Sequence, residues 1–244
     1  MLTHALVTDA GGRKVNEDSI GAFEKGIRQC FVVCDGLGGH GMGDVASSLV
    51  RDHFGKRFES MTDIKNFLDI SFEGAQAELL DTQKKLNAGN KMKTTAVVLL
   101  TDDKKAYIGH IGDSRLYVFH KNAVRMRTKD HSLPQMLVQS GEIREEEIRN
   151  HPERNIVMRV MGTKWDDGHK YEIMRPVPLR KCQAFLLCTD GFWELVNEKE
   201  MCDCLREASS VSDWLIRMNK IVRSNGISKN ENMDNYSAIA VWNT

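Results

Sequence analysis

Several common signals are missing from this chain of 244 residues, and each absence removes a class of protein. Lys and Arg together number 34, as do Asp and Glu, so no excess positive field attracts nucleic acid or anionic lipid. No apolar run approaches the roughly 18 residues that a membrane-spanning helix requires. The N-terminus lacks the charged start and the apolar stretch of a secretion signal. We therefore expect a cytoplasmic protein that binds neither nucleic acid nor a membrane.

The cysteines also argue against a zinc protein. None of the six belongs to a C-x-x-C pair, so the usual zinc spacing is absent. Most of them are expected to be reduced and buried, as free cysteine usually is. A chain of this length can form two small domains or one larger domain. Because no change in composition and no internal repeat divides it, we expect a single domain over residues 1–244.

Apolar residues recur with two different periods along the chain. Spacings of three and four residues predict helices at 44–61, 64–79, 198–206 and 211–225. Short segments rich in Val, Ile and Tyr predict strands at 2–8, 19–23, 28–34, 94–101, 106–111, 115–120, 124–126, 171–179, 184–188 and 236–242. Short turns between consecutive strands imply antiparallel pairing rather than a parallel doubly wound sheet. The long polar segment 128–162 is either a lid or a solvated connection.

The stretch from Phe31 to Gly41 organises the rest of the chain. An apolar run ends in Asp35, a turn with four glycines follows, and a helical pattern begins at Asp44. The run predicts a buried strand that carries Asp35 at its carboxyl end, and the glycines let backbone carbonyls approach a bound cation. Residues 36–41 also match G-x-G-x-x-G, a dinucleotide-binding pattern. Asp35 would repel a pyrophosphate there, so a metal-binding turn is the better interpretation.

Three further aspartates stand at predicted strand ends beside Gly, Ser or Asn. They are Asp113, Asp190 and Asp234. Each one alone would be interpreted as a turn residue, because Asp and Gly fill turns for local reasons. Together with Asp35 they indicate a shared cation, since neighbouring carboxylates repel one another unless a cation gathers them. Carboxylate, carbonyl and water oxygens suit Mg²⁺ or Mn²⁺, whereas zinc prefers His or Cys.

Six motifs follow one another along nearly the whole chain. They are Arg13-x-x-Asn16-Glu17-Asp18, Asp35-Gly36-Leu37-Gly38-Gly39-His40, Gly112-Asp113-Ser114-Arg115, Asp130-His131-Ser132, Thr189-Asp190-Gly191-Phe192-Trp193 and Asp234-Asn235. In this order they resemble the metal-dependent protein phosphatases of the protein phosphatase 2C type. Residues 141–155 resemble the flap of the compact bacterial branch. The resemblance implies an α+β fold of four layers, with two central antiparallel sheets between helix pairs and a flap near 141–162.

The resemblance also implies a ligand set for two tightly bound Mn²⁺ or Mg²⁺ ions. Asp35 would bridge the two ions, and the carbonyl of Gly36 would bind one of them. Asp190 and Asp234 would complete the ligands of the other ion. Two ions at a short separation can share a water and lower its pKa, so that hydroxide attacks phosphorus directly near neutral pH.

Four more motif residues have implied roles at the edge of that centre. Asp18 and Glu17 would hold metal-bound waters. Asp113, with help from Asp190, would bind a third and weaker ion. Arg13 would bind the phosphate, because its planar guanidinium matches a pair of phosphate oxygens.

One position departs from the resemblance and leaves the proton donor open. Many eukaryotic members carry a histidine directly after the Asp-Gly pair, whereas this chain has Leu37. His40 lies three residues further on, as in bacterial relatives, and a metal-bound water is the alternative donor. His131 is expected to be structural.

The expected activity is hydrolysis of phosphoserine and phosphothreonine in proteins by a monomer that opposes a cognate Ser/Thr kinase. Two alternatives remain. A catalytically dead relative would bind phosphoproteins, although such a relative usually loses a ligand, and Arg13, Asp35, Asp190 and Asp234 are all present. An oxidoreductase that binds a dinucleotide would rest on residues 36–41 alone.

Overall fold

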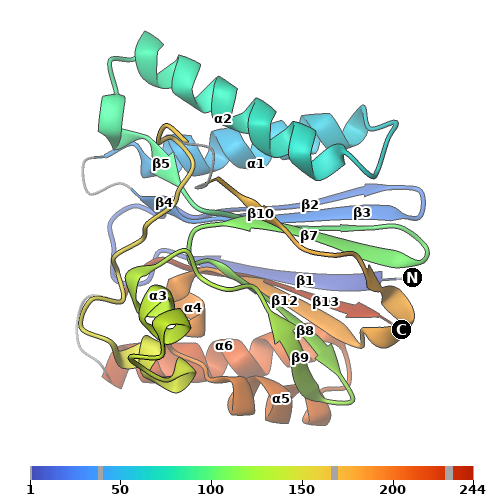
Figure 1. The fold of residues 1–244 in the computed structure, drawn as a ribbon. Helices are drawn as coiled ribbons and strands as arrows, with labels where there is room; N and C mark the ends of the chain where they lie inside the picture. Colours follow the sequence, from blue (N-terminus) through green and yellow to red (C-terminus); the bar gives the residue numbers. More distant parts are fainter. Residues whose placement is uncertain (1, 38–40, 166–169, 229–232, 244) are drawn as a thin grey trace.

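The computed structural model describes residues 2–37, 41–165, 170–228 and 233–243. Figure 1 shows four layers, in which a helix pair, two stacked sheets and a second helix pair follow one another. This arrangement confirms the α+β fold that the motifs implied. All neighbouring strands in both sheets are antiparallel, as the short turns predicted.

The first sheet has the strand order β10-β7-β6-β3-β2, with β11 also paired to β7. Its strands are β2 (Ser19–Lys25), β3 (Arg28–Cys34), β6 (Ala96–Thr101), β7 (Lys105–Ile111), β10 (Glu172–Ile173) and β11 (Val177–Pro178). Nearly all residues of β3 and β6 are buried, because layers cover the sheet on both faces. That burial explains why these two strands have almost continuous apolar sequences.

The second sheet has the strand order β1-β13-β12-β8-β9. Its strands are β1 (Leu2–Asp9), β8 (Arg115–His120), β9 (Ala123–Arg127), β12 (Ala184–Cys188) and β13 (Tyr236–Asn243). β1 and β13 pair along their full length, from Leu2 opposite Asn243 to Asp9 opposite Tyr236. The two ends of the chain therefore lie side by side in Figure 1.

Three apolar clusters hold the four layers together. The first lies between the first sheet and the helices α1 (Gly43–Glu59) and α2 (Phe67–Lys85). The second lies between the second sheet and α5 (Glu198–Glu207) and α6 (Val211–Ser228). The third joins the two sheets. Alternation along β3 divides its side chains, since Phe31 and Val33 face the other sheet while Val32 faces the helices.

Two predicted strands differ from the structure. The strand expected at 94–101 is broken at Thr95 into β5 (Lys93–Thr94) and β6, and β5 pairs instead with the short strand β4 (Gly36–Leu37). The strand expected at 171–179 is wrong, because only β10 and β11 are extended and paired there. Pro176 and Pro178 lack the N–H that a continuous ladder requires.

The polar segment 128–162 covers one edge of the sandwich. It contains the helix α3 (Leu133–Ser140) and the 3₁₀ helix η2 (Glu145–Asn150), and single bridges join Ser132 to Val157 and Thr94 to Met161. The remaining short elements are η1 (Gly89–Lys91), η3 (Leu179–Lys181) and α4 (Asp190–Trp193). All six cysteines are free, and all but Cys202 are buried. Within the described ranges, no helix is both long and apolar enough to cross a membrane.

Candidate metal centre

The predicted aspartates meet at one edge of the sandwich. Asp35 follows β3, Asp113 lies in the turn between β7 and β8, Asp190 opens α4 after β12, and Asp234 precedes β13. These four residues line one cavity of about 840 Å³, together with Glu17 and Gly36. Asp18 stands before β2, where its charge raises the pKa of Asp35 and the charge of Asp190 raises the pKa of Asp18. We refer to Asp18, Asp35, Asp113, Asp190 and Asp234 as the acid cluster.

Two glycines allow the segments of the acid cluster to approach closely. A Cβ atom at Gly36 would overlap the backbone oxygens of Glu17 and Gly43. A Cβ atom at Gly191 would overlap the backbone oxygen of Asn235. Each glycine directly follows an aspartate of the cluster. Because a glycine has no side chain, the neighbouring backbone segments can pack closely there, and this packing brings the carboxylates together.

The backbone around Asp35 is fixed by two threonines. The amide of Asp35 donates to Thr95 Oγ1 over 3.0 Å, and its carbonyl accepts from the amide of Thr95 at 2.9 Å and from Thr94 Oγ1 at 2.8 Å. Thr95 Oγ1 also lies 2.7 Å from Ser114 Oγ, beside Asp113. The break in the predicted strand at Thr95 therefore ties together the two turns that carry Asp35 and Asp113.

The backbone around Asp113 is held by groups from two other segments. His131 donates its amide to the carbonyl of Gly112 over 2.9 Å and accepts the Gly112 amide at Nδ1 over 3.2 Å. Trp193 Nε1 donates to the carbonyl of Asp113 over 3.0 Å. The sequence motifs contained both residues, but nothing in the spacing revealed that they hold Asp113.

Burial and mutual repulsion raise the pKa values of the acid cluster. Burial, followed by the carboxylates of Asp190 and Asp18, raises the pKa of Asp35 well above its usual range. Burial and the charge of Asp190 do the same to the pKa of Asp113. Burial raises the pKa of Asp18 to about 7 and that of Asp190 to about 6. Four carboxylates that resist ionisation together need a cation nearby.

No cationic side chain among the described residues forms an ion pair with Asp18, Asp35, Asp113 or Asp190. One oxygen of Asp18, Oδ1, is buried without a hydrogen-bond partner, while Oδ2 accepts from Thr189 Oγ1 over 3.0 Å. The available donors are carboxylate oxygens and the Gly36 carbonyl. This set of hard oxygen ligands fits Mg²⁺ or Mn²⁺.

Arg13 lies at the rim of the acid cluster. Its guanidinium donates to Asp234 Oδ2 over 3.2 Å, and both side chains are about half exposed. The loop that carries Arg13 is held by Asn235, whose Nδ2 donates to the carbonyls of Ala10 and Val15 and whose Oδ1 accepts the amide of Glu17. Asn235 therefore positions both Arg13 and Glu17, a role that its place next to Asp234 did not reveal.

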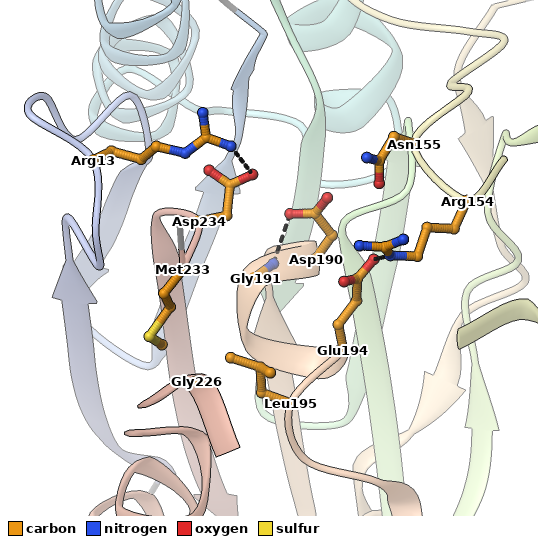
Figure 2. Close-up of a pocket in the computed structure, with 10 residues that line it drawn as sticks. All are labelled: Arg13, Arg154, Asn155, Asp190, Gly191, Glu194, Leu195, Gly226, Met233 and Asp234. Atoms are coloured by element: carbon orange, nitrogen blue, oxygen red, sulfur yellow. Dashed lines mark hydrogen bonds and ion pairs between the residues drawn. The ribbon is translucent and has the colours of Figure 1, made fainter. Parts of the chain in front are cut away.

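Figure 2 shows a second cavity, of about 330 Å³, that opens beside Asp190 and Asp234. Arg13 and Arg154 reach toward these aspartates from opposite sides. Arg154 donates from Nε to Glu194 Oε1 over 2.7 Å. Both cavities share Arg13, Asn155, Asp190 and Asp234, so they form one groove with the acid cluster at its middle. The polar segment 128–162 thus reaches the groove through Arg154 and Asn155.

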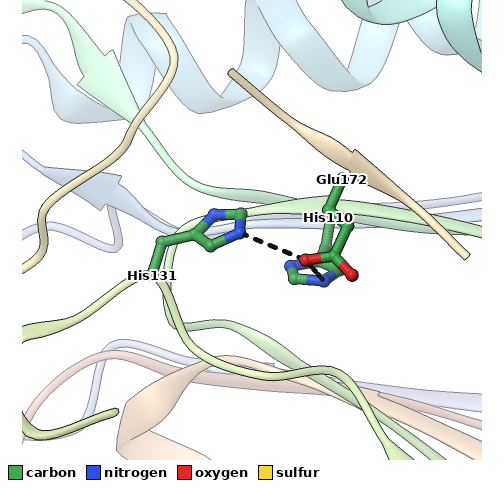
Figure 3. A group of neighbouring side chains, drawn as sticks. All are labelled: His110, His131 and Glu172. Atoms are coloured by element: carbon green, nitrogen blue, oxygen red, sulfur yellow. Dashed lines mark ion pairs between the residues drawn. The ribbon is translucent and has the colours of Figure 1, made fainter. Parts of the chain in front are cut away.

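A second group of titratable side chains lies under the polar segment. Figure 3 shows His110 and His131 beside Glu172, whose Oε2 is 3.9 Å from Nε2 of each histidine. Because Nδ1 of His131 accepts from Gly112, the proton of its neutral ring lies on Nε2, the atom that would have to bind a metal. Burial lowers the pKa of His131 to about 3 and that of His110 to about 4. We interpret the pair as a neutral, stacked element that supports Gly112, which agrees with the structural role expected for His131.

The two candidate proton donors predicted from the sequence are His40 and a metal-bound water. His40 lies outside the described residues. Leu37 ends β4, where its Cα partner is Lys93 of β5, and it lines the larger cavity. Among the described residues that line this cavity there is no histidine.

A cluster of oxygen ligands at the edge of a two-sheet sandwich, with an arginine at its rim, defines a metal-dependent phosphatase. Comparison with known proteins agrees. The family described as Protein phosphatase 2C matches residues 11–234, and the chain belongs to this family. It is a serine/threonine protein phosphatase, a metal-dependent hydrolase. Family membership removes the dinucleotide-binding alternative for residues 36–41.

Several relatives support this assignment. The serine/threonine phosphatase stp of Listeria welshimeri is 34% identical over 214 residues, which are 84% of each chain. The crystal structure of Stp1 from Staphylococcus aureus superposes with a TM-score of 0.88 at 31% identity and covers 100% of this chain and 96% of its own. The catalytic domain of PstP in complex with two manganese ions gives a TM-score of 0.80 at 25% identity, over 99% and 97% of the two chains.

Proposed function

We propose that the acid cluster is the catalytic centre of this phosphatase and that it binds two Mn²⁺ or Mg²⁺ ions. The observation that carries the proposal is the concentration of four carboxylates without a cationic partner in the described part of the chain. In this assignment Asp35 would be a ligand to both ions, the Gly36 carbonyl would be a ligand to one of them, and Asp190 and Asp234 would be ligands to the other. The two manganese ions of the PstP catalytic domain support it.

Asp18 and Glu17 would act one step further out. The orphaned Oδ1 of Asp18 is suited to accept a hydrogen bond from water in the coordination shell. Burial raises the pKa of Glu17, and its backbone is fixed by Asn235. Asp113 lies deeper, with 4% of its surface exposed, and would bind a third and weaker ion together with Asp190.

Bound ions would lower the pKa of water and stabilise charge on the phosphate, so that hydroxide attacks phosphorus without a phosphoenzyme. Arg13 would bind two phosphate oxygens through its planar guanidinium. For this step it must exchange its contact with Asp234, which the half-exposed geometry allows. Asn235 would keep the Arg13 loop in place while the contact is exchanged.

The experiment that tests the assignment is a calorimetric titration of metal-free protein with Mn²⁺. Asp35→Asn should abolish the tight binding phase and also p-nitrophenyl phosphate hydrolysis. Asp103→Asn, in the exposed turn between β6 and β7, is the matched control and should bind Mn²⁺ as the wild type does. Unchanged tight binding in Asp35→Asn would contradict the assignment.

We further propose that the protein is a monomeric, single-domain enzyme of the cytoplasm that reverses the action of a Ser/Thr kinase. Six free cysteines are typical of a reducing compartment. A phosphatase for phosphoserine and phosphothreonine requires a kinase that makes these groups. Sedimentation of the purified protein tests the oligomeric state, and fractionation of the source cells tests the compartment.

A further inference from the structure

One end of the catalytic groove carries two lysines. Lys91 ends η1, and Lys93 begins β5. Both line the larger cavity, which also contains the acid cluster residues Asp35 and Asp190. Lys93 pairs with Leu37, and Thr94 pairs with Gly36, the residue directly after Asp35. Lys93 therefore lies on the strand that runs beside the Asp35 turn.

Buried neighbours hold both lysines in place beside the cavity. Met92 and Thr94 are completely buried, and Thr94 binds the carbonyl of Asp35. Lys91 is exposed and Lys93 is half-buried. Lys91 closes η1 and Lys93 lies in β5, and both line the larger cavity. The buried positions therefore anchor the segment to the core, and the two lysines face the groove.

This end of the groove has a net positive charge if the carboxylates that would bind the metal ions are not counted. Every carboxylate that lines the larger cavity belongs to the proposed ligand set, namely Glu17, Asp35, Asp113, Asp190 and Asp234. Neither Lys91 nor Lys93 forms an ion pair among the described residues, whereas Arg13 has Asp234. Within the part of the chain that the structure describes, two cations without an ion-pair partner thus remain beside the place where the phosphate would bind.

The polar segment supplies another part of the wall of the same cavity. Val157, Met158 and Val160 line it, and Met158 is 53% exposed. Three consecutive acidic residues of the polar segment, Glu145, Glu146 and Glu147, do not line either cavity of the groove. They are occupied elsewhere, since Glu145 pairs with Arg127 while Glu146 and Glu147 pair with Arg144.

We propose that Lys91 and Lys93 form a subsite for acidic side chains of the phosphoprotein substrate, next to the phosphorylated residue. The subsite favours phosphopeptides with Asp or Glu two or three positions from the phosphoserine or phosphothreonine, a reach of roughly 7–10 Å in extended chain. The inference rests on the proposed position of the metal centre. It deepens that proposal, because it names the class of substrate.

The test compares phosphothreonine peptides that differ only in their flanking residues. One peptide is neutral, one carries two Asp before the phosphothreonine, one carries two Asp after it, and one carries two Lys. Each kcat/KM is divided by that for p-nitrophenyl phosphate, which has no flanking residues. We expect one Asp peptide to exceed the neutral peptide by roughly threefold to tenfold, the size of two exposed ion pairs. The preference should shrink as salt is added.

The charge reversal Lys91→Glu/Lys93→Glu should remove this preference and favour the Lys peptide instead. Lys104→Glu/Lys105→Glu carries the same change in net charge at two exposed positions, the turn before β7 and the first residue of β7, outside the groove, and should keep the wild-type ratio. An unchanged ratio in Lys91→Glu/Lys93→Glu would overturn the subsite. An equal loss on neutral and acidic peptides would also overturn it, because the lysines would then act on the phosphate alone.

Failure of the metal-centre assignment gives a different result. In that case Asp35→Asn would keep wild-type turnover of every peptide. The position of the lysines relative to the bound phosphate would then be undefined. A wild-type enzyme that hydrolyses all peptides at one rate, with Asp35→Asn inactive, would overturn the subsite only.

Discussion

The molecule holds two buried groups of charged residues that are built on opposite plans. In the acid cluster, carboxylates face one another, and among the described residues only Asp234, at the rim, has a cationic partner. In the second group, Arg115 donates from Nε and from an Nη atom to the two oxygens of Asp130 over 2.9 and 2.6 Å, with side chains only 3% and 1% exposed. Arg115 also donates to the hydroxyl of Tyr117 over 3.1 Å. We refer to this second group as the Arg115 network.

The contrast separates a structural use of charge from a functional one. Burial disfavours the charged form of Arg115, but the charge of Asp130 outweighs it and raises the pKa of Arg115 further. The Arg115 network is therefore complete within the chain. The acid cluster is incomplete, since burial and repulsion both raise its pKa values. A cation from solution is what completes it, and this need is the physical basis of a metal site.

Trp193 connects the two groups. Its ring lies under the Arg115 guanidinium, with Cζ 3.4 Å from the ring centroid, and Arg149 of η2 lies 5.5 Å from the same ring. The indole Nε1 donates to the carbonyl of Asp113 in the acid cluster. The complete group thus provides a rigid support for the incomplete one.

Removing one charge from the acid cluster should have the largest effect. Asp190→Asn should lower the rate of p-nitrophenyl phosphate hydrolysis roughly a thousandfold or more, because a ligand to the ions is lost. Saturating Mn²⁺ should not restore the rate. The same substitution should leave thermal unfolding of the metal-free protein unchanged or shift it upward, since one repulsive charge is gone. A rate loss below tenfold would return Asp190 to the role of a turn residue.

Removing the cation from the Arg115 network should leave a buried carboxylate without its main partner. Arg115→Met leaves the buried carboxylate of Asp130 with only Arg127, and should lower the free energy of unfolding by about 3–5 kcal/mol. Urea denaturation measures this loss. Arg144→Met, whose side chain is 73% exposed, is the control and should change the stability little, because exposed ion pairs contribute little. If both variants lost equal stability, burial of the pair would have no special importance.

The two groups should also differ in their response to pH in metal-free protein. The folded pKa of Asp18, about 7, lies above its ordinary value of 3.8, so folding binds protons and stability is lost as pH rises through that interval. Asp35 and Asp113 act in the same direction. The buried histidines His110 and His131, with lowered pKa values, act in the opposite direction below about pH 6.5.

The informative window therefore lies between about pH 6.5 and pH 8. There the unfolding free energy of metal-free protein should fall as pH rises, and Asp18→Asn should make the decline smaller below about pH 7. Bound Mn²⁺ should remove it, because the ions favour the charged carboxylates. Stability that rises across this window would mean that the carboxylates are already ionised without metal.

The smallest effect is expected where His131 holds the turn of Asp113. In His131→Asn, the amide Oδ1 can replace Nδ1 as acceptor for the Gly112 amide, whereas the longer side chain in His131→Gln places its acceptor elsewhere. We expect His131→Gln to lower turnover at limiting Mn²⁺ by roughly tenfold, the value of one buried hydrogen bond, and His131→Asn to stay near wild type. Equal losses in both variants would show that the ring acts by packing alone.

The sequence predicted the strand ends that carry Asp35, Asp113, Asp190 and Asp234, because each motif is local and its strand has a clear apolar pattern. The strand at 171–179 failed, because its apolar pattern outweighed two prolines whose effect on pairing was overlooked. The roles of Asn235 and Trp193 could not be predicted either. Both act on residues far away in the chain, and such contacts depend on which strands become neighbours. The groove lysines were missed for the same reason, since the pairing of β4 with β5 places them.

The pairing of the first strand with the last has a consequence for biosynthesis. β13 lies between β1 and β12, so the second sheet is split until residues 236–243 have left the ribosome. Asp234, directly before β13, reaches its partners at the same moment. The second sheet therefore cannot be completed before residue 243 has been made, and until then β1 lacks its partner, which lies more than 220 residues away along the chain.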